Sequence, residues 1–240
     1  MSKSATWSQS PASLSLSSAE VHVWRVDLEQ PEHVVQRFRA TLEDHETHRA
    51  DRFHFERDRR AFAVGRGFLR QVLGRYLGMK PEALRFAYGP YGKPALDGEQ
   101  TLQFNMSHSR AVGLVAVAEA KDVGVDVEYI RADFASEDIA RRFFSPTEVE
   151  AFNALPEDEQ VAGFFRCWAR KEAYIKAIGR GLSQPLDGFD VTLAPDVAPA
   201  LLRADEDDVS RWSLSDIDVG HDYAGAVVVE GQISNIRCWQ

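Results

Sequence analysis

The sequence contains few cysteines and no long apolar run. Its 240 residues include two cysteines, Cys167 and Cys238, which are too few for a disulfide framework and lack the spacing of a metal site. No apolar run approaches the ~18 residues that cross a membrane, so we expect no membrane partner. Residues 1–20 are rich in serine but have no apolar centre of a secretory signal, which predicts a flexible leader and a cytoplasmic protein.

The sequence also has fewer basic residues than acidic ones. The 28 lysines and arginines face 37 aspartates and glutamates, and this net charge of −9 argues against a nucleic-acid partner. The arginines are unevenly placed, however, and many of them fall between residues 49 and 75. A local cationic region in an acidic protein suits a small anionic ligand better than a polymer.

The stretch Phe164–Leu182 predicts a long helix, because its apolar residues recur at helical spacing and no proline interrupts it. Gly179 is the expected helix stop, since glycine accepts the left-handed backbone that ends a helix. Trp168, Glu172 and Lys176 are spaced four residues apart and so share one face. Taken alone, an acid and a base at this spacing can be a stabilising ion pair and nothing more.

The order of elements indicates an internal repeat. A predicted strand near Val23 and a helix ending at Gly78 precede, by 101 positions each, a strand near Gly124 and the helix ending at Gly179. Short strands follow each helix. We therefore predict two similar α+β halves, residues 21–121 and 122–240.

Three short segments upstream accompany the long helix. They are Tyr91–Pro94 (YGKP), Phe104–Ser109 (FNMSHS) and Gly124–Glu128 (GVDVE). In this order, followed by Trp168–Lys176 (WARKEAYIK), they resemble the 4'-phosphopantetheinyl transferases, and among them the larger Sfp-type enzymes. The resemblance extends from about residue 49 to residue 193. It implies two α+β halves related by pseudo-twofold symmetry, an active site in the cleft between them, and a monomer.

The acidic residues suggest a metal site. Asp126 and Glu128 lie two apart on a predicted strand, so both carboxylates face one side, where they repel each other unless a cation or solvent intervenes. A solvent-facing strand edge is the ordinary alternative for such a pair. Glu172 adds a third carboxylate from the helix, and oxygen ligands of this kind suit Mg²⁺. By resemblance, these three residues are the metal ligands.

The remaining motifs bear on the co-substrate. Lys93 follows a glycine in a turn, and a lysine in a turn is ordinarily a solvated surface residue. The resemblance instead places Lys93 at the phosphates of coenzyme A. Ser107 and His108 are adjacent on an extended chain and point to opposite faces, which argues against a hydrolase pair. The resemblance assigns both to coenzyme A phosphate contacts. Arg57 is our candidate for the 3'-phosphate or adenine side.

The resemblance thus implies an enzyme that uses Mg²⁺ and transfers 4'-phosphopantetheine from coenzyme A to a serine of an apo acyl or peptidyl carrier protein, releasing adenosine 3',5'-bisphosphate. Such carriers serve fatty acid, polyketide or nonribosomal peptide synthesis. Lys176 would bind the phosphates and offset their charge, and Glu172 would accept the hydroxyl proton directly or through water. The alternatives are a non-catalytic regulator that binds coenzyme A and a Mg²⁺-dependent nucleotide hydrolase.

Overall fold

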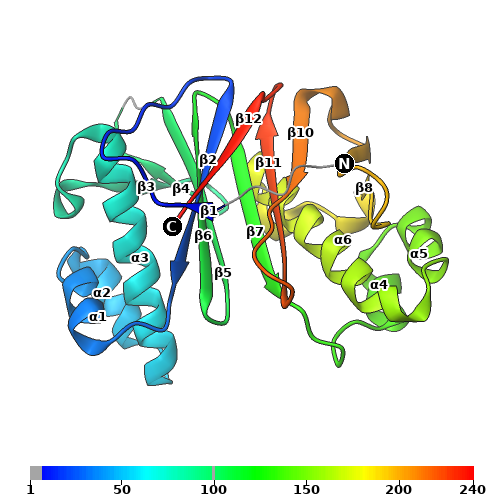
Figure 1. Cartoon of the computed structure of the whole chain (residues 1–240), viewed down its shortest axis with the longest axis horizontal. Helices are drawn as coiled ribbons and strands as arrows, with labels where there is room; N and C mark the ends of the chain where they lie inside the picture. The colour runs from blue at the N-terminus through cyan, green and yellow to red at the C-terminus, as the bar shows by residue number, and fades with distance from the viewer. Residues whose placement is uncertain (1–6, 99–100) are drawn as a thin grey trace.

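Two β-sheets stand side by side in the middle of the molecule, with helices on both outer flanks (Figure 1). The computed structural model describes residues 7–98 and 101–240. In chain order, the first part contains β1 (Trp7–Ser8), β2 (Glu20–Asp27), α1 (Glu32–Arg39), α2 (Asp44–Asp51), α3 (Glu56–Leu77), η1 (Pro81–Ala83), β3 (Phe86–Tyr88), β4 (Pro94–Leu96), β5 (Leu102–Ser109) and β6 (Val112–Glu119). The second part contains β7 (Val123–Tyr129), α4 (Glu137–Phe143), α5 (Pro146–Asn153), α6 (Glu157–Ile178), η2 (Gly181–Ser183), η3 (Leu186–Gly188), β8 (Phe189–Val191), β9 (Leu201–Ala204), η4 (Val209–Arg211), β10 (Trp212–Asp216), β11 (Tyr223–Glu230) and β12 (Asn235–Trp239).

The strand pairing is mostly antiparallel. The larger sheet has the order β1-β12-β2-β6-β5, and the second has the order β10-β11-β7. Helices α1–α3 lie on the outer side of the first sheet and α4–α6 on the outer side of the second (Figure 1). Helices segregated from largely antiparallel sheets define an α+β fold, so the predicted fold class is confirmed. Within the described residues, no helix combines the length and the apolar character needed to span a membrane.

Helices α3 and α6 correspond closely. Each has 22 residues, and their first and last residues are 101 positions apart. Each ends at a glycine in the left-handed conformation, Gly78 with φ 62° and Gly179 with φ 71°, as the sequence predicts. The neighbouring strands have matching orders, β2-β6-β5 and β7-β11-β10. These correspondences support the predicted repeat, while the pseudo-twofold relation stays a prediction.

Both chain ends differ from what the sequence suggested. Part of the expected flexible leader is held in place, because Trp7 and Ser8 pair with β12 and Arg75 donates to Ser10 Oγ at 2.8 Å; residues 1–6 lie outside the described residues. The last strand, expected within the 122–240 half, pairs with β2 of the other sheet. Its Cys238 is buried in an apolar cluster formed by residues from strands of both sheets. This burial stabilises the crossing of β12 into the first sheet. The division at residues 21–121 and 122–240 otherwise stays a prediction.

Gly124 lets α6 approach β7 closely. A Cβ atom built at this position would lie 2.0 Å from Ala173 O and 2.3 Å from Ala177 N, both in the backbone of α6. No real side chain tolerates such distances, so any larger residue forces the helix away from the strand. The close packing of α6 on β7 therefore depends on this glycine.

We expect Gly124→Ala to lower the free energy of unfolding by about 3 kcal/mol, because the added methyl group collides with helix backbone that cannot yield. Chemical denaturation monitored by circular dichroism measures the loss. Gly89→Ala is the matched control, since its nearest neighbour would be Lys93 O at an ordinary 3.6 Å. Equal stability of the two variants would contradict the packing role of Gly124.

Candidate active site

Three predicted motifs meet where β5, β7 and α6 adjoin. Lys176 Nζ, on the last turn of α6, donates to Asp126 Oδ1 on β7 at 2.5 Å and to Ser107 Oγ on β5 at 2.8 Å. Ser107 Oγ in turn donates to the same Asp126 oxygen at 2.7 Å. Residues far apart in the sequence thus form one hydrogen-bonded cluster, with a cation beside a buried carboxylate.

Asp126 has one satisfied and one unsatisfied oxygen. Its side chain is only 2% exposed, and its Oδ2 is buried without a hydrogen-bond partner among the described residues. A buried carboxylate oxygen is costly to leave unpaired. The free oxygen is therefore available to a ligand that brings a positive charge or a hydrogen-bond donor.

The other two carboxylates resist ionisation. Burial, followed by the negative charge of Asp126, raises the pKa of Glu128 to about 7, although Ser109 Oγ donates to its Oε2 at 3.0 Å. Burial and the charge of Asp126 also raise the pKa of Glu172, against the opposing effect of Lys176. The three acids therefore lie close enough to repel one another, and a cation would relieve that repulsion.

These residues fit a magnesium ion whose remaining ligands are water molecules and substrate phosphates. No trio of Asp, Glu, His or Cys side chains in the described part of the chain stands close enough to enclose a metal. Mg²⁺ does not need such a cage, because it commonly binds one or two carboxylates, several waters and the substrate phosphates. The unpaired oxygen of Asp126 is available as one carboxylate ligand. The pKa values of Glu128 and Glu172 are raised, so a nearby cation would stabilise the charged forms of both side chains. The assignment of all three as ligands stays a prediction.

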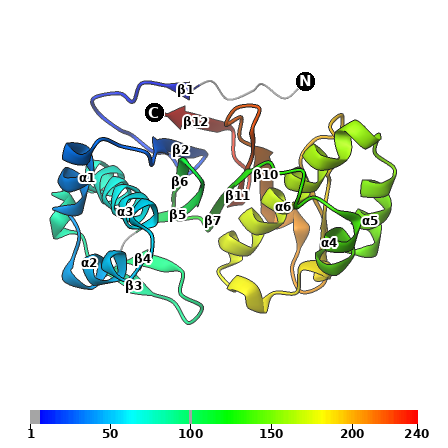
Figure 2. The ribbon, with the colours of Figure 1, turned by 90° about the horizontal axis from the view of Figure 1, so that it is seen from below.

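Lys93 reaches the same region from the other side. The β3–β4 hairpin extends toward α6 (Figure 2), and Lys93 Nζ donates to Ala177 O at 2.8 Å and lies 3.7 Å from Asp122 Oδ1. Burial lowers the pKa of Lys93, and Asp122 partly counters this. Lys93 and Lys176 line one cavity of about 190 Å³, which gives it two cationic walls. The full lining is Tyr91, Gly92, Lys93, Asn105, Ile175, Lys176, Gly179 and Gly181.

His108 and Arg57 lie outside this cavity lining. His108 has solvent-exposed atoms, but neighbouring protein atoms still displace water from around its ring. This desolvation, followed by the charge of Lys176, lowers the pKa of His108. Asp58 opposes this shift, which places the start of α3 on the His108 side. Arg57 is 81% exposed there, and its Nε contacts Asp58 Oδ1 at 3.3 Å. The coenzyme A contacts predicted for His108 and Arg57 stay predictions.

Lys171, the neighbour of Glu172, has a structural role. Its side chain is 1% exposed, and Nζ donates to Glu148 Oε2 at 2.6 Å and to Phe189 O at 2.6 Å. Glu148 also closes the capping box at the start of α5 by accepting from Ser145 N. The pair fixes the rotation of α6, so that Glu172 and Lys176 face the site. The sequence signal for it was the Ser-x-x-Glu pattern that opens α5.

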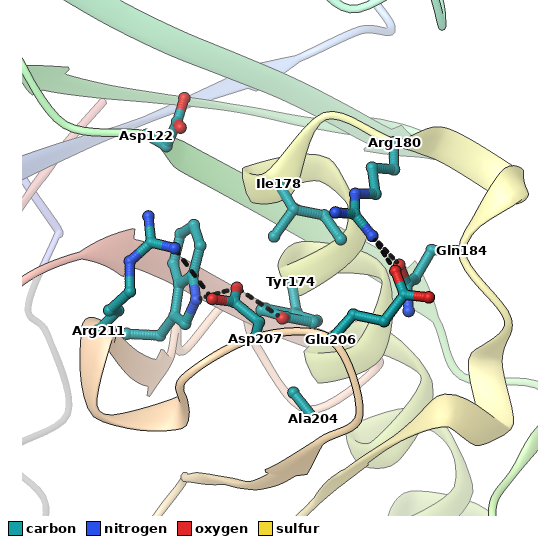
Figure 3. A pocket seen from close by; sticks show the side chains of 10 residues that line it. Asp122, Tyr174, Ile178, Arg180, Gln184, Ala204, Glu206, Asp207 and Arg211 are labelled. Atoms are coloured by element: carbon teal, nitrogen blue, oxygen red, sulfur yellow. Dashed lines mark hydrogen bonds and ion pairs between the residues drawn. The ribbon is translucent and has the colours of Figure 1, made fainter.

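A second cavity of about 180 Å³ lies by the C-terminal end of α6 (Figure 3). Both of its arginines are paired with acids: Arg180 bonds to Glu206 at 2.5 Å, and Arg211 donates to Asp207 at 3.0 Å, which also accepts from Tyr174 Oη at 3.0 Å. None of the predicted site residues lines it. The cavity shared by Lys93 and Lys176 is therefore the better candidate for an anionic substrate.

The fold and the site together define an enzyme suited to a phosphate-bearing substrate, with carboxylates for a cation and lysines for anionic oxygens. Residues 27–120 match the family model "4'-phosphopantetheinyl transferase, N-terminal", and residues 122–228 match "4'-phosphopantetheinyl transferase superfamily". The chain belongs to this superfamily, and the predicted family and enzyme class are confirmed.

Two individual relatives, HetI and Sfp, agree with this assignment. The chain is 42% identical over 229 residues to the 4'-phosphopantetheinyl transferase HetI of Nostoc sp. (strain PCC 7120), covering 94% of each chain. It is 30% identical over 189 residues to the 4'-phosphopantetheinyl transferase Sfp of Bacillus subtilis (strain 168), covering 79% of this chain and 83% of that one. The solved holo-[acyl-carrier-protein] synthase of Thermotoga maritima matches with 23% identity and a TM-score of 0.36, over 46% of this chain and 63% of that one.

The raised pKa of Glu128 predicts a dependence of stability on pH. The folded protein holds a proton on Glu128 up to about pH 7, whereas the unfolded chain releases it above the ordinary value of 4.5, so wild-type stability falls as pH rises between these values. Glu128→Gln removes this loss. Without divalent cations, we expect the variant to exceed wild type by about 1–3 kcal/mol at pH 8 and by little at pH 4.5.

Urea denaturation at both pH values measures this difference. Glu137→Gln is the control, because the hydrogen bond from Arg141 lowers the pKa of that surface carboxyl and its removal should bring no gain at pH 8. A Glu128→Gln variant no more stable than wild type at pH 8 would show that Glu128 titrates normally.

Proposed function

We propose that the enzyme transfers the 4'-phosphopantetheine group of coenzyme A to a serine hydroxyl of an apo acyl or peptidyl carrier protein. The observation that carries the proposal is the cluster of Lys176 with Asp126 and Ser107, beside the cavity that Lys176 shares with Lys93. This arrangement offers positive charge to a diphosphate and carboxylates to its counter-ion. The names of HetI and Sfp, both 4'-phosphopantetheinyl transferases, support the reaction class.

In this reaction the carrier serine oxygen forms a bond to the β-phosphorus of coenzyme A. The bond from that phosphorus to the bridging oxygen breaks, and adenosine 3',5'-bisphosphate leaves with the electron pair. Asp126 and Glu128, with Glu172, would hold Mg²⁺, which supplies polarisation of the diphosphate when bound. Lys176 offsets the negative charge that builds on the phosphate oxygens.

The serine proton needs an acceptor, and Glu172 is our candidate. Burial raises its pKa, which makes it a stronger base than an ordinary surface carboxylate. Lys93, from the opposite wall of the cavity, would bind the coenzyme A phosphates, with Ser107 and His108 nearby on β5 and Arg57 toward the 3'-phosphate. We further infer a monomer, because both family segments lie in one chain. The cytoplasmic location that we propose rests on the sequence, which has no apolar centre of a secretory signal in residues 1–20.

We expect Asp126→Ala and Glu172→Ala each to lower kcat/KM for carrier modification by at least about 10³-fold, because each loses transition-state charge stabilisation. Intact-mass spectrometry of an apo carrier incubated with coenzyme A and Mg²⁺ measures the transfer. Asp138→Ala, which removes an exposed acid on α4, is the matched control.

Two outcomes would redirect the proposal. Release of phosphopantetheine from coenzyme A without a carrier would indicate a hydrolase. Coenzyme A binding without transfer to any of several carriers would indicate the regulatory binder. Near-normal turnover of either alanine variant would exclude that carboxylate from the site.

The phosphate contacts predict a separate kinetic effect. Lys93→Met and Arg57→Ala should each raise the KM for coenzyme A by about 10-fold with a smaller change in kcat, because each removes a charge that binds the ground state as well as the transition state. Lys121→Met is the control, since Lys121 does not line the cavity and its Nζ donates to Gln232 O. An unchanged KM in Arg57→Ala would rule out its contact with the 3'-phosphate side.

A further inference from the structure

Strands β5 and β7 lie side by side where the two sheets meet (Figures 1 and 2). They are not joined as the strands within each sheet are, because no backbone ladder between them occurs in the described part of the chain. The connection is made instead by alternate side chains of β5, namely Asn105, Ser107 and Ser109. We call this set the β5–β7 seam.

Each seam residue bonds to a particular point on β7. Asn105 Oδ1 accepts from Val125 N at 3.0 Å, and Ser109 Oγ accepts from Tyr129 N at 3.0 Å. The three side chains share one face of β5, because residues two apart on a strand point the same way. Asn105 is 6% and Ser107 is 7% exposed, so the seam is largely shielded from water.

The seam also holds the carboxylates. Ser109 Oγ accepts from the β7 backbone and at the same time donates to Glu128 Oε2 at 3.0 Å, so one hydroxyl fixes both the strand and its acidic side chain. Ser107 Oγ donates to Asp126 Oδ1. Asn105 lines the cavity that contains Lys176. Side-chain length, and not the spacing of a backbone ladder, therefore sets the distance from β5 to the acids.

We propose that Asn105 and Ser109 are positioning residues for the Asp126–Glu128 carboxylate pair. Asn105 anchors β7 just before Asp126, and Ser109 anchors it just after Glu128, so the acidic segment is held at both ends. This inference rests on the proposed function only where it concerns the metal. Groups that orient metal ligands commonly affect affinity about 10–100-fold.

Amide hydrogen exchange on the full chain without ligands tests the anchoring. Asn105→Ala should speed exchange at the Val125 amide, and Ser109→Ala at the Tyr129 amide, each by about 5-fold or more, because each variant removes the acceptor of that one amide. Ser109→Thr keeps the hydroxyl and should keep the protection. Ser213→Ala is the control: its hydroxyl donates to Gly231 O from β10, at the opposite edge of the second sheet.

A magnesium titration of carrier modification tests the positioning. Ser109→Ala should raise the Mg²⁺ concentration for half-maximal rate by about 10-fold. Ser109→Thr should restore the wild-type value, and Ser213→Ala should not alter it. Ser109→Ala removes a single oxygen atom from a partly buried site and so keeps the test available even if Asn105→Ala fails to fold.

The outcomes separate this inference from the proposed function. A wild-type protein that modifies no carrier would remove the proposed function, while the exchange pattern would still decide whether the seam anchors β7. Unchanged exchange at Val125 and Tyr129 would overturn the anchoring. Mg²⁺-dependent transfer with the same half-saturation in wild type and Ser109→Ala would overturn the positioning role alone.

Discussion

The close approach of α6 to β7 is the contact on which the site depends. Gly124 has no Cβ, so the backbone of α6 at Ala173 and Ala177 can lie against the strand. That approach brings Lys176 within hydrogen-bond distance of Asp126 and places Glu172 where it responds to the charge of Asp126. A helix displaced by even one methyl group would separate these charges, because Coulombic interactions between them weaken with distance.

The site is assembled against the mutual repulsion of its acids, and the surrounding structure supplies the compensation. On the adjacent face of α6, Lys171 is fixed by Glu148 and by Phe189 O, and these bonds hold the helix in one rotational setting. Lys176 neutralises one oxygen of Asp126 but leaves the other unpaired. The result is a group of buried, mutually repelling carboxylates that an added cation would stabilise, and such strained charge is typical of functional sites.

Local signals in the sequence predicted the individual parts of this site, whereas contacts between residues distant in sequence determined how those parts come together. The helix ends at Gly78 and Gly179 follow from glycine conformation, and the shared face of Asp126 and Glu128 follows from strand geometry. The crossing of β12 into the first sheet could not be predicted, because strand partners are chosen by contacts distant in sequence. The same holds for the bond from Lys93 to Ala177 O and for Asn105 as a partner of β7.

The correspondence between α3 and α6 extends to a buried ion pair on each helix. Lys171 corresponds, 101 positions earlier, to Arg70, and both are buried cations that pair with the glutamate of a capping box, Glu148 in α5 and Glu46 in α2. A buried ion pair of the same kind therefore holds each of the two long helices.

The site residues repeat only in part, since Glu128 and Lys176 correspond at the same offset to Asp27 and Arg75. Asp126 and Glu172 correspond instead to Arg25 and Gln71, so the complete set of three acids occurs only once in the sequence. Lys93 reaches the site from the β3–β4 hairpin, and Ser107 reaches it from β5. The three acids thus lie on β7 and α6, whereas Lys93 lies on the β3–β4 hairpin and Ser107 on β5, and the seam between β5 and β7 holds the two groups together.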